Sequence, residues 1–311
     1  MHCNNQIRTI CRVVHENRAP EISTVNLTVD IQQRRIIFMK TIKYLTVFCM
    51  MICMIMQLNT NVSANENNIC YVAHRGYTKY APENSIPAFE AAGKEGFQAV
   101  ECDIHETTKD KKGKRRFVIM HDQTLNRMCG LSGKNVYQKK LTYQKIRSKY
   151  HIKTGNNIES YTKKQLRIPS LEEYLSICKR YHMKPVIEIK QKMKKDTIKR
   201  LYQSLKKAKM QNRAVVTCKY KQQLTYMRKY TRKMPLEYVR HDFTQNDLSW
   251  MKKYHINVSI NKNILSDDMI QLFEANNIKI NIWTINNKDQ LYNFTNKGIK
   301  IVTSDDTLWK E

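Results

Sequence analysis

The stretch from Tyr71 to Asp122 reads YVAHRGYTKYAPENSIPAFEAAGKEGFQAVECDIHETTKDKKGKRRFVIMHD, and the rest of the chain is organised around it. An apolar run at 69–73 is of the short β-branched kind that a buried strand uses, and it stops at a His-Arg-Gly triplet. Turn and helix-start residues follow at 82–85, and small apolar residues then recur at helical spacing. A second apolar strand begins at Ala99. The stretch therefore predicts a βα unit whose first strand ends at chemically capable side chains.

The second strand carries two carboxylates. Glu101 and Asp103 are two residues apart, so both side chains project from the same side of a strand. Two like charges this close require a cation. The turn signature at 109–113 and the apolar run at 117–120 predict a hairpin centred on the turn, which returns His121 to the position beside Asp103, or to within a residue or two of it if the turn carries a bulge.

The same alternation continues to the C-terminus. The predicted strands after the hairpin are 185–190, 214–219, 236–240, 257–260, 279–284 and 299–303, and the predicted helices are 171–181, 221–231, 245–254, 267–276 and 288–296. Eight parallel strands result when the hairpin return is treated as an excursion. The pattern predicts an α/β fold, a (β/α)8 TIM barrel with a hairpin excursion after the second strand. The polar insert at about 129–167 is expected to be a long loop over the strand ends that shapes substrate access.

The amino-terminal part has a different pattern. Two lysines precede an apolar run at 44–56, and Val62-Ser63-Ala64 supplies small residues for cleavage, which together indicate a secretory signal peptide. The apolar run is also short for a membrane-spanning helix, which needs about 20 residues. We predict that residues 1–38 are a mis-called extension before the true start at Met39, that 39–64 are the signal peptide and that 65–311 are one domain. The alternatives are an unusually long signal, a retained membrane anchor and, least favoured, a lipoprotein.

The predicted mature part is strongly basic. Residues 65–311 keep 48 of the 55 Lys and Arg and 24 of the 27 Asp and Glu, a net charge of +24. Such an excess favours polyanionic surroundings, such as an anionic cell-surface polymer or lipid headgroups. No helix-turn-helix, zinc-finger or RNA-binding signature accompanies it, so nucleic acid is not a predicted partner. Most of the lysines are scattered and are typical of a solvated basic surface.

Five cysteines lie in this part, and none forms a C-x-x-C pair. Cys102, Cys178 and Cys218 lie in apolar segments and are predicted to be buried small hydrophobic residues. The sequence leaves open whether any of the five forms a disulfide.

The motifs, taken in order, resemble the glycerophosphodiester phosphodiesterase family, which is related to the phosphatidylinositol-specific phospholipases C. The resemblance covers the chain from about Ile69 to the C-terminus. The matching motifs are His74-Arg75-Gly76, Pro82-Glu83-Asn84-Ser85, Glu101-x-Asp103, His121-Asp122, Leu125-x-Arg127, Ile168-Pro169-Ser170-Leu171-Glu172-Glu173, Glu188-x-Lys190 and Trp283-Thr284-Ile285-Asn286. Each motif alone is weak, whereas the ordered set is specific.

The predicted metal site consists of Glu101, Asp103 and Glu188, at the carboxyl ends of barrel strands, where barrel enzymes collect their active residues. Three carboxylates suit a hard cation, so Ca2+ or Mg2+ is favoured over zinc. The resemblance implies the same ligand set. It also implies that His74 and His121 share the acid and base work, for which imidazole is suited near neutral pH.

Three further side chains are predicted to bind substrate. Arg75 offers a charge-assisted fork to a phosphate oxygen and Lys190 a point charge near it. The structural alternatives are an ion pair for Arg75 and a bridge from Lys190 to Glu101 or Glu188. Trp283 resembles the family's strand-end tryptophan and is expected to pack on glycerol, with a core aromatic as the alternative.

Two other motif positions and two departures from the family pattern affect the site less directly. Helix capping alone accounts for Glu83 and Asn84. The Ser-Phe of relatives is Cys218-Lys219 here, and their closing Thr-Asp reads Thr303-Ser304-Asp305. We expect that neither departure touches the metal or the histidines and that both affect alcohol specificity.

The resemblance, together with the signal-peptide pattern, thus implies a secreted, metal-dependent glycerophosphodiester phosphodiesterase that releases sn-glycerol 3-phosphate and an alcohol from a small-molecule substrate. One alternative is a phospholipase C- or D-like enzyme acting on lipids or teichoic-acid-type polymers, although the polar insert argues against an apolar lip. The other is a catalytically silent barrel that holds a polyanion, yet no histidine or carboxylate of the motif set is missing.

Overall fold

The computed structural model describes residues 35, 37–48, 50–51 and 69–310, and the chain divides into the units Met1–Ala64 and Asn65–Glu311. In the first unit, residues 37–48 are helical and their side chains are exposed. Among the described residues, no helix is both long and apolar enough to cross a membrane. The predicted cleavage after Ala64 and the predicted extension up to residue 34 lie outside the described residues.

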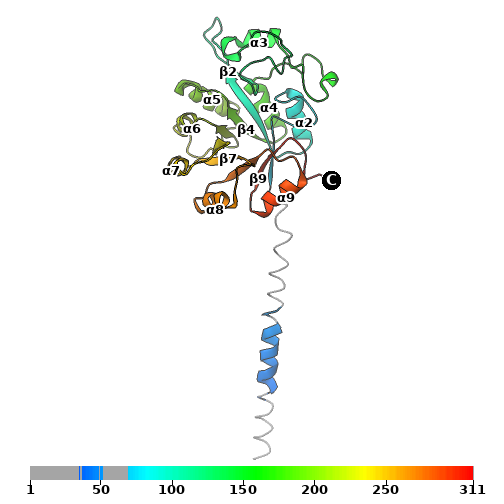
Figure 1. Ribbon diagram of the computed structural model, residues 1–311, viewed down its shortest axis with the longest axis vertical. Helices are drawn as coiled ribbons and strands as arrows, with labels where there is room; N and C mark the ends of the chain where they lie inside the picture. Colours follow the sequence, from blue (N-terminus) through cyan, green and yellow to red (C-terminus); the bar gives the residue numbers. More distant parts are fainter. Residues whose placement is uncertain (1–34, 36, 49, 52–68, 311) are drawn as a thin grey trace, which may run out of the picture. The chain divides into compact units, whose positions relative to one another are not determined.

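The second unit is built on a closed ring of eight parallel strands. Strand β1 pairs with β9 on one side and with β2 on the other, and the remaining parallel pairings run in order around the ring. The strands of the ring are β1 (Cys70–Ala73), β2 (Ala99–Glu106), β4 (Lys184–Ile189), β5 (Val215–Cys218), β6 (Leu236–Arg240), β7 (Asn257–Asn261), β8 (Ile280–Trp283) and β9 (Ile301–Ser304). The predicted (β/α)8 barrel is confirmed (Figure 1).

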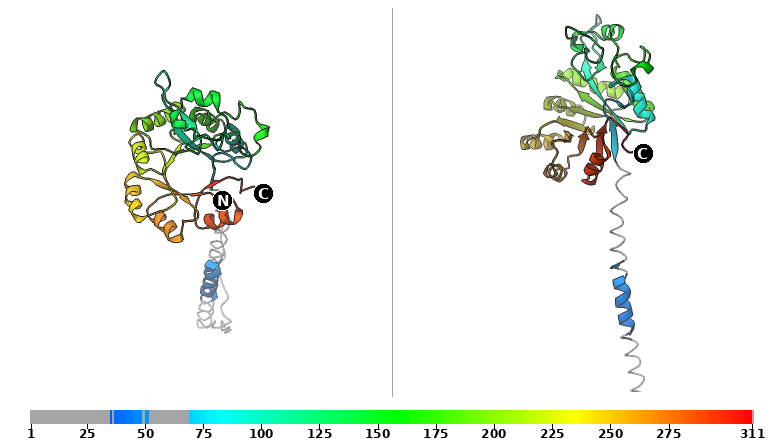
Figure 2. Two further views of the ribbon diagram at one scale, coloured as in Figure 1. Left: turned by 45° about the horizontal axis from the view of Figure 1, so that its top comes forward. Right: turned by 45° about the vertical axis from the view of Figure 1, so that its right-hand side comes forward.

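Helices surround the ring in the described part of the chain, as the left view of Figure 2 shows. They are α2 (Ile86–Lys94), α4 (Leu171–Arg180), α5 (Lys195–Lys207), α6 (Lys221–Arg228), α7 (Gln245–Tyr254), α8 (Asp267–Ala275) and α9 (Lys288–Asn296). Helix α5 was not predicted, because its many lysines suggested only a solvated surface. Ile198, Leu201 and Leu205 recur at helical spacing, however, and form its buried face.

The predicted hairpin exists, with a register one residue from the predicted one. Strand β3 (Phe117–Ile119) pairs antiparallel with β2 so that Ile104 lies opposite Ile119. Met120 is therefore opposite Asp103, and its N–H donates to the Asp103 carbonyl at 3.0 Å. The shift arises because the axis of the hairpin lies half a residue before the assumed turn centre. His121 still follows directly, so the hairpin returns it to the same end of the barrel.

The insert is only in part the long loop that its polarity suggested. It contains helix α3 (Tyr143–Lys149) and two short 3-10 turns, η2 (Gln138–Lys140) and η3 (Ile158–Ser160). Its apolar side chains form a second core with the hairpin strand: Val118, Met120, Leu125, Met128, Cys129, Ile146, Ile152, Leu166 and Ile168. Arg147 also forms two hydrogen bonds of 2.7 and 2.8 Å with Glu173 of α4. The apolar residues of this small core are sparse in the sequence and follow no period, so the sequence pattern did not predict it.

All five described cysteines carry free thiols. Cys102, Cys178 and Cys218 are fully buried, as predicted, and their burial raises the pKa of each thiol.

Three polar side chains are linked by hydrogen bonds inside the barrel, where barrels of this kind usually pack branched apolar side chains. Glu237 on β6 is only 3% exposed and accepts a 2.9 Å hydrogen bond from Asn281 Nδ2 on β8. Asn281 Oδ1 in turn accepts from the Thr303 hydroxyl on β9 at 2.8 Å. Burial raises the pKa of Glu237 to about 7, although the Asn281 bond opposes the shift.

We expect Glu237→Gln to stabilise the protein in a pH-dependent way. The folded-state pKa is raised above the usual glutamate value of 4.5, so the wild-type carboxyl costs no stability at low pH. It lowers the free energy of unfolding as the pH rises from 4.5 through 7. The gain from the substitution should therefore grow by about 3 kcal/mol from below pH 4.5 to above pH 7. Thermal unfolding at several pH values measures it. The exposed Glu274→Gln serves as the control and should show no such trend.

Candidate active site

The site begins at the loop that follows β1. Gly76 has φ +87°, and a Cβ there would lie 2.6 Å from Ala88 Cβ and 2.8 Å from the Ala88 backbone carbon of α2, so only glycine fits. Arg75 also has a left-handed φ of 56°, and its N–H donates to Glu101 Oε2 at 2.9 Å. The strained turn thus fixes His74 and Arg75 over the carboxyl ends of the strands.

The three predicted carboxylates meet there. Glu101, Asp103 and Glu188 offer oxygen atoms that all lie within 4.8 Å of one another. Glu101 Oε1 is buried and has no hydrogen-bond partner in the described part of the chain. Burial raises the pKa of Glu101 and of Glu188, and the negative charge of Asp103 raises both further. An ionised cluster of this kind needs a cation, so the donor set fits a hard metal ion.

Two cations stand beside the carboxylates. Lys190 Nζ lies 3.0 Å from Glu188 Oε1 and 3.3 Å from Asp103 Oδ1. The contact with Glu188 is the bridge that was named as the structural alternative for Lys190, and Asp103 is a second partner in it. Arg75 Nε lies 3.5 Å from Asp103 Oδ2. Although burial opposes ionisation, Lys190 and Arg75 lower the pKa of Asp103 to about 2. One carboxylate of the cluster is therefore ionised at any physiological pH.

Helix capping does not explain Glu83 and Asn84, and this interpretation was wrong. The N-cap of α2 is Ser85, whose hydroxyl accepts from the Ala88 N–H. The Asn84 side chain instead clasps Asp103: its Nδ2 donates to Asp103 Oδ2 at 2.7 Å, and its Oδ1 accepts from the Asp103 N–H at 3.2 Å. Asn84 therefore orients a predicted metal ligand.

Glu83 belongs to an ion-pair chain at the edge of the site. It accepts from Arg75 at 3.2 Å and from Arg127 Nη2 at 2.6 Å. Arg127 also bonds Asp122, with 2.7 Å from its Nε to Oδ2. These contacts join the loop after β1 to the segment after β3.

Each predicted catalytic histidine has its own carboxylate. His74 Nδ1 lies 2.8 Å from Asp305 Oδ1, and His121 Nδ1 lies 2.9 Å from Asp122 Oδ1. Despite partial burial, hydrogen bonds hold the pKa of Asp305 at about 2 and that of Asp122 below its usual range. An ionised carboxylate only accepts, so Nδ1 of each ring carries the proton. The Nε2 atoms are thereby left to exchange protons with a ligand.

The tertiary structure also overturns one expectation about the family departures. Asp305, in the Thr303-Ser304-Asp305 segment, was expected to lie away from the histidines, yet it contacts His74 directly. Its Oδ1 also accepts from Thr78 at 3.0 Å and its Oδ2 from Asn286 at 2.7 Å. The aspartate is displaced by one residue in sequence, but the turn after β9 places it beside the ring.

A cavity of about 120 Å³ gathers the predicted residues. Of the predicted site residues, only the buried Asp103 is absent from its lining, which includes His74, Arg75, Glu101, His121, Glu188, Lys190 and Trp283. Trp283 Nε1 is buried without a hydrogen-bond partner among the described residues, so it is a donor available to a ligand. A larger cavity lies at the opposite end of the strands, but it contains none of these groups.

His241, which was not predicted as a site residue, follows β6 and also lines the small cavity. Its ring meets Trp283 edge to face, with 4.8 Å between the ring centroids. The position of His241 directly after a predicted barrel strand could have indicated this, because such residues line the catalytic end of a barrel. His105 was missed as well: it is buried on β2, and burial lowers its pKa.

Comparisons with known proteins point to one family. The model of the glycerophosphoryl diester phosphodiesterase family matches residues 74–308. Glycerophosphodiester phosphodiesterase 1 of Mus musculus is 23% identical over 260 residues, which cover 72% of this chain and 74% of that protein. A putative glycerophosphodiester phosphodiesterase of Bacillus subtilis, YhdW, is 34% identical over 113 residues, which cover 36% of this chain and 40% of that protein.

Solved structures share the fold. A phosphodiesterase from Oleispira antarctica has a TM-score of 0.66 at 21% identity, covering 76% of this chain and 92% of that chain. A putative glycerophosphoryl diester phosphodiesterase from Silicibacter pomeroyi has the same TM-score at 16% identity, covering 76% and 90%. The family match over residues 74–308, together with the motif set it contains, identifies the chain as a member of the glycerophosphoryl diester phosphodiesterase family and hence as a phosphoric diester hydrolase.

Proposed function

We propose that this protein is a secreted, divalent-metal-dependent enzyme that hydrolyses glycerophosphodiesters to sn-glycerol 3-phosphate and an alcohol. The observation that carries the proposal is the pair of histidines, each held at Nδ1 by an aspartate, on a cavity that is also lined by Glu101 and Glu188. The Oleispira antarctica relative was solved in complex with the product sn-glycerol-3-phosphate, which supports a small-molecule substrate of this class.

Glu101, Asp103 and Glu188 are the proposed metal ligands. The buried, unpartnered oxygen of Glu101 and the carboxyl-only donor set favour Ca2+ or Mg2+. When bound, such an ion polarises a phosphoryl oxygen and raises the acidity of a coordinated hydroxyl. Lys190 contacts two of the three ligands, so it balances their charge and stands next to the site where a phosphate would lie.

The remaining steps belong to the chain's own side chains. Arg75 Nε, buried and without a hydrogen bond in the described residues, is the proposed donor to a phosphate oxygen. One histidine Nε2 removes the proton of the attacking oxygen, and the other protonates the leaving alcohol. The open donor of Trp283 faces the glycerol side in this scheme, because Trp283 lines only the inner cavity.

The leaving alcohol is assigned to a wider groove. This groove, of about 610 Å³, shares His74 and Arg75 with the inner cavity, so a phosphodiester bound at those two residues extends into both. Thr78, Asn156 and Asn286 line it, so it is polar. A polar groove favours a water-soluble alcohol over a lipid tail and disfavours the phospholipase alternative.

Secretion is part of the proposal because of the basic, apolar and small-residue pattern of residues 39–64. N-terminal sequencing of the exported protein should start at Asn65. A membrane-retained protein that still carries the apolar run would favour the anchor alternative.

The test of the proposed activity is an assay of the purified protein on a panel of glycerophosphodiesters. We expect release of sn-glycerol 3-phosphate from glycerophosphocholine, glycerophosphoethanolamine or glycerophosphoglycerol, and slower release from lysophospholipids. Turnover of lysolipids alone would favour the phospholipase alternative. Polyanion binding with no turnover of any substrate would favour the silent barrel.

A separate prediction concerns Asp305 as a positioning residue. Asp305→Asn keeps the shape but allows the side chain to donate to Nδ1, which favours the wrong tautomer of His74. We expect turnover to fall by about 10- to 100-fold, as for other groups that orient a reacting side chain. The loss should appear in kcat rather than in KM, because the substitution misorients a proton-transfer group. Asp268→Asn, on an exposed aspartate in the first turn of α8 outside both cavities, is the matched control and should retain activity.

A further inference from the structure

A cavity larger than that of the candidate active site lies at the opposite end of the barrel from it. It has a volume of about 760 Å³ and is lined by the first residues of the ring strands, such as Cys70, Ala99, Val215 and Ile301. Cavities of this size are typical of small-molecule sites. Nothing in the catalytic scheme uses it.

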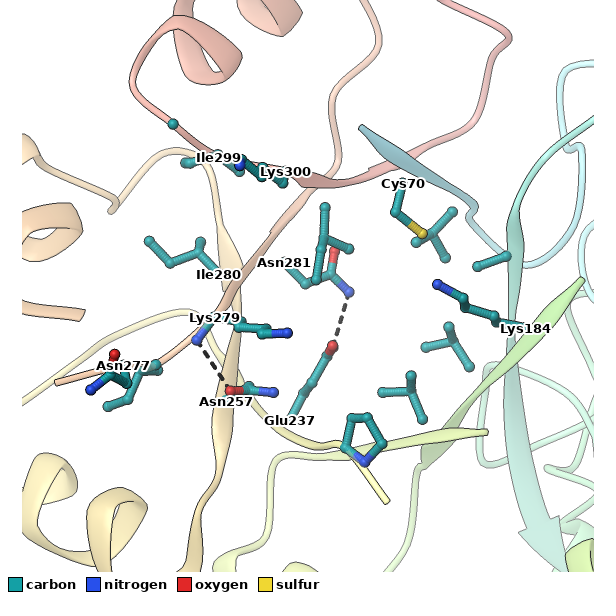
Figure 3. Close-up of a pocket in the computed structure, with 18 of the residues that line it drawn as sticks. Cys70, Lys184, Glu237, Asn257, Asn277, Lys279, Ile280, Asn281, Ile299 and Lys300 are labelled. Atoms are coloured by element: carbon teal, nitrogen blue, oxygen red, sulfur yellow. Dashed lines mark hydrogen bonds between the residues drawn. The ribbon is translucent and has the colours of Figure 1, made fainter. Parts of the chain in front are cut away.

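Apolar side chains form most of the cavity wall, and basic side chains stand around it. Lys184 and Lys279 point into the cavity from opposite sides (Figure 3), and Arg213 and Lys300 also line it. All four of these basic residues are exposed, so solvent reaches their charges. The carboxyls among the lining residues are Glu237 and Glu274. The cavity therefore carries an excess of positive charge over an apolar surface.

Glu237 is a buried carboxyl in the lining of the cavity. One of its oxygens is held by Asn281, while Oε1 has no partner in the part of the chain that the structure describes. No described cation forms an ion pair with it either, although Lys184 and Glu237 are both close enough to Cys70 to influence that thiol. In its protonated form, the carboxyl is a hydrogen-bond donor at the inner end of the cavity.

We propose that this cavity is a second ligand site, which binds a small organic anion with an apolar body between Lys184 and Lys279. The two ammonium groups attract the anionic group, and the walls formed by Val72, Val186, Val215, Ile280 and Ile301 bury the apolar part. An inorganic anion would not bury the apolar walls, and a cation would be repelled by the four basic side chains, so neither fits the cavity. The protonated Glu237 carboxyl adds a donor without adding repulsion.

The test uses 8-anilinonaphthalene-1-sulfonate as a fluorescent probe of the full-length protein. We expect saturable binding of one probe per chain and its displacement by octanoate but not by octanol. The double variant Lys184→Gln/Lys279→Gln should bind octanoate about tenfold more weakly by calorimetry. Lys206→Gln/Lys207→Gln, two exposed lysines of α5 outside the cavity, is the matched control and should bind as the wild type does.

A pH series gives an independent readout. The titratable groups that face Glu237 across the cavity are Cys70, Lys184, Arg213, Glu274, Lys279 and Lys300. Octanoate affinity should fall as the pH rises from about 6 to about 8, because Glu237 then ionises and repels the ligand. Glu237→Gln should remove most of this dependence and keep the affinity seen at low pH.

Ile301→Trp tests the location by filling the cavity. We expect it to abolish octanoate binding while circular dichroism shows an intact fold; if it unfolds the protein, the lysine pair and the pH series decide the question. Equal octanoate binding by wild type and the lysine double variant, with displacement by octanol, would overturn the proposal. This site is independent of the proposed phosphodiesterase activity, so its failure leaves that activity unaffected.

Discussion

Replacing His74 or His121 by alanine is expected to lower turnover of a glycerophosphodiester by about 100- to 10,000-fold, the usual contribution of one positioned proton-transfer group. Each ring lines the cavity and is held by a carboxylate at Nδ1, which leaves Nε2 for proton exchange. Its loss therefore removes a proton acceptor or donor without removing a carboxylate ligand. Steady-state kinetics measures the loss. His151→Ala, in the insert and outside the cavity, is the control.

The two losses should be non-additive, because a site that lacks one partner gains little from the other. A nitrophenyl ester has an acidic leaving group that needs less protonation, so it should rescue mainly the variant that lacks the acid. This comparison assigns the roles of the two rings. Near-normal turnover of glycerophosphocholine by both alanine variants, with the metal still bound, would exclude the two-histidine mechanism.

Chelation is expected to abolish activity, and Ca2+ or Mg2+ is expected to restore it. Without a bound cation, Lys190 and Arg75 compensate the carboxylates only in part, and the remaining negative charge repels a phosphate. Activity assays with and without chelator, combined with elemental analysis, measure this effect. Full turnover in chelator, with no metal found, would contradict it.

Glu188→Gln should weaken metal affinity and activity together, since an amide is a poorer ligand than a carboxylate for a hard cation. Calorimetric titration with each metal reports affinity independently of turnover. Glu237→Gln is the matched control, because it also neutralises a buried carboxyl of the barrel but lies at the other end. A Glu188→Gln protein with unchanged metal affinity would remove Glu188 from the ligand set.

The sequence was sufficient for the fold and for most of the candidate site because both depend on local patterns. Short apolar strands alternating with amphipathic helices specify parallel βα units, and a closed barrel brings the carboxyl ends of all its strands to one face. The side chains at the ends of these strands therefore converge, namely His74 after β1, Glu101 and Asp103 on β2, and Glu188 and Lys190 at the end of β4. Periodicity also explains why α5 was recoverable in principle: Ile198, Leu201 and Leu205 carry its helical spacing.

Contacts between segments distant in sequence were decided only by the tertiary structure. Asp305 reaches His74 across 231 positions, and Asn84 clasps Asp103 instead of capping a helix. No local propensity encodes such pairs, because a carboxylate or amide satisfies its hydrogen bonds with whichever donor the packed loops bring near. The small core of the insert depends in the same way on apolar side chains brought together from separate segments. Sequence by itself thus determined the barrel and the identity of the chemical groups, whereas packing decided which groups orient them and created the cavity at the far end of the strands.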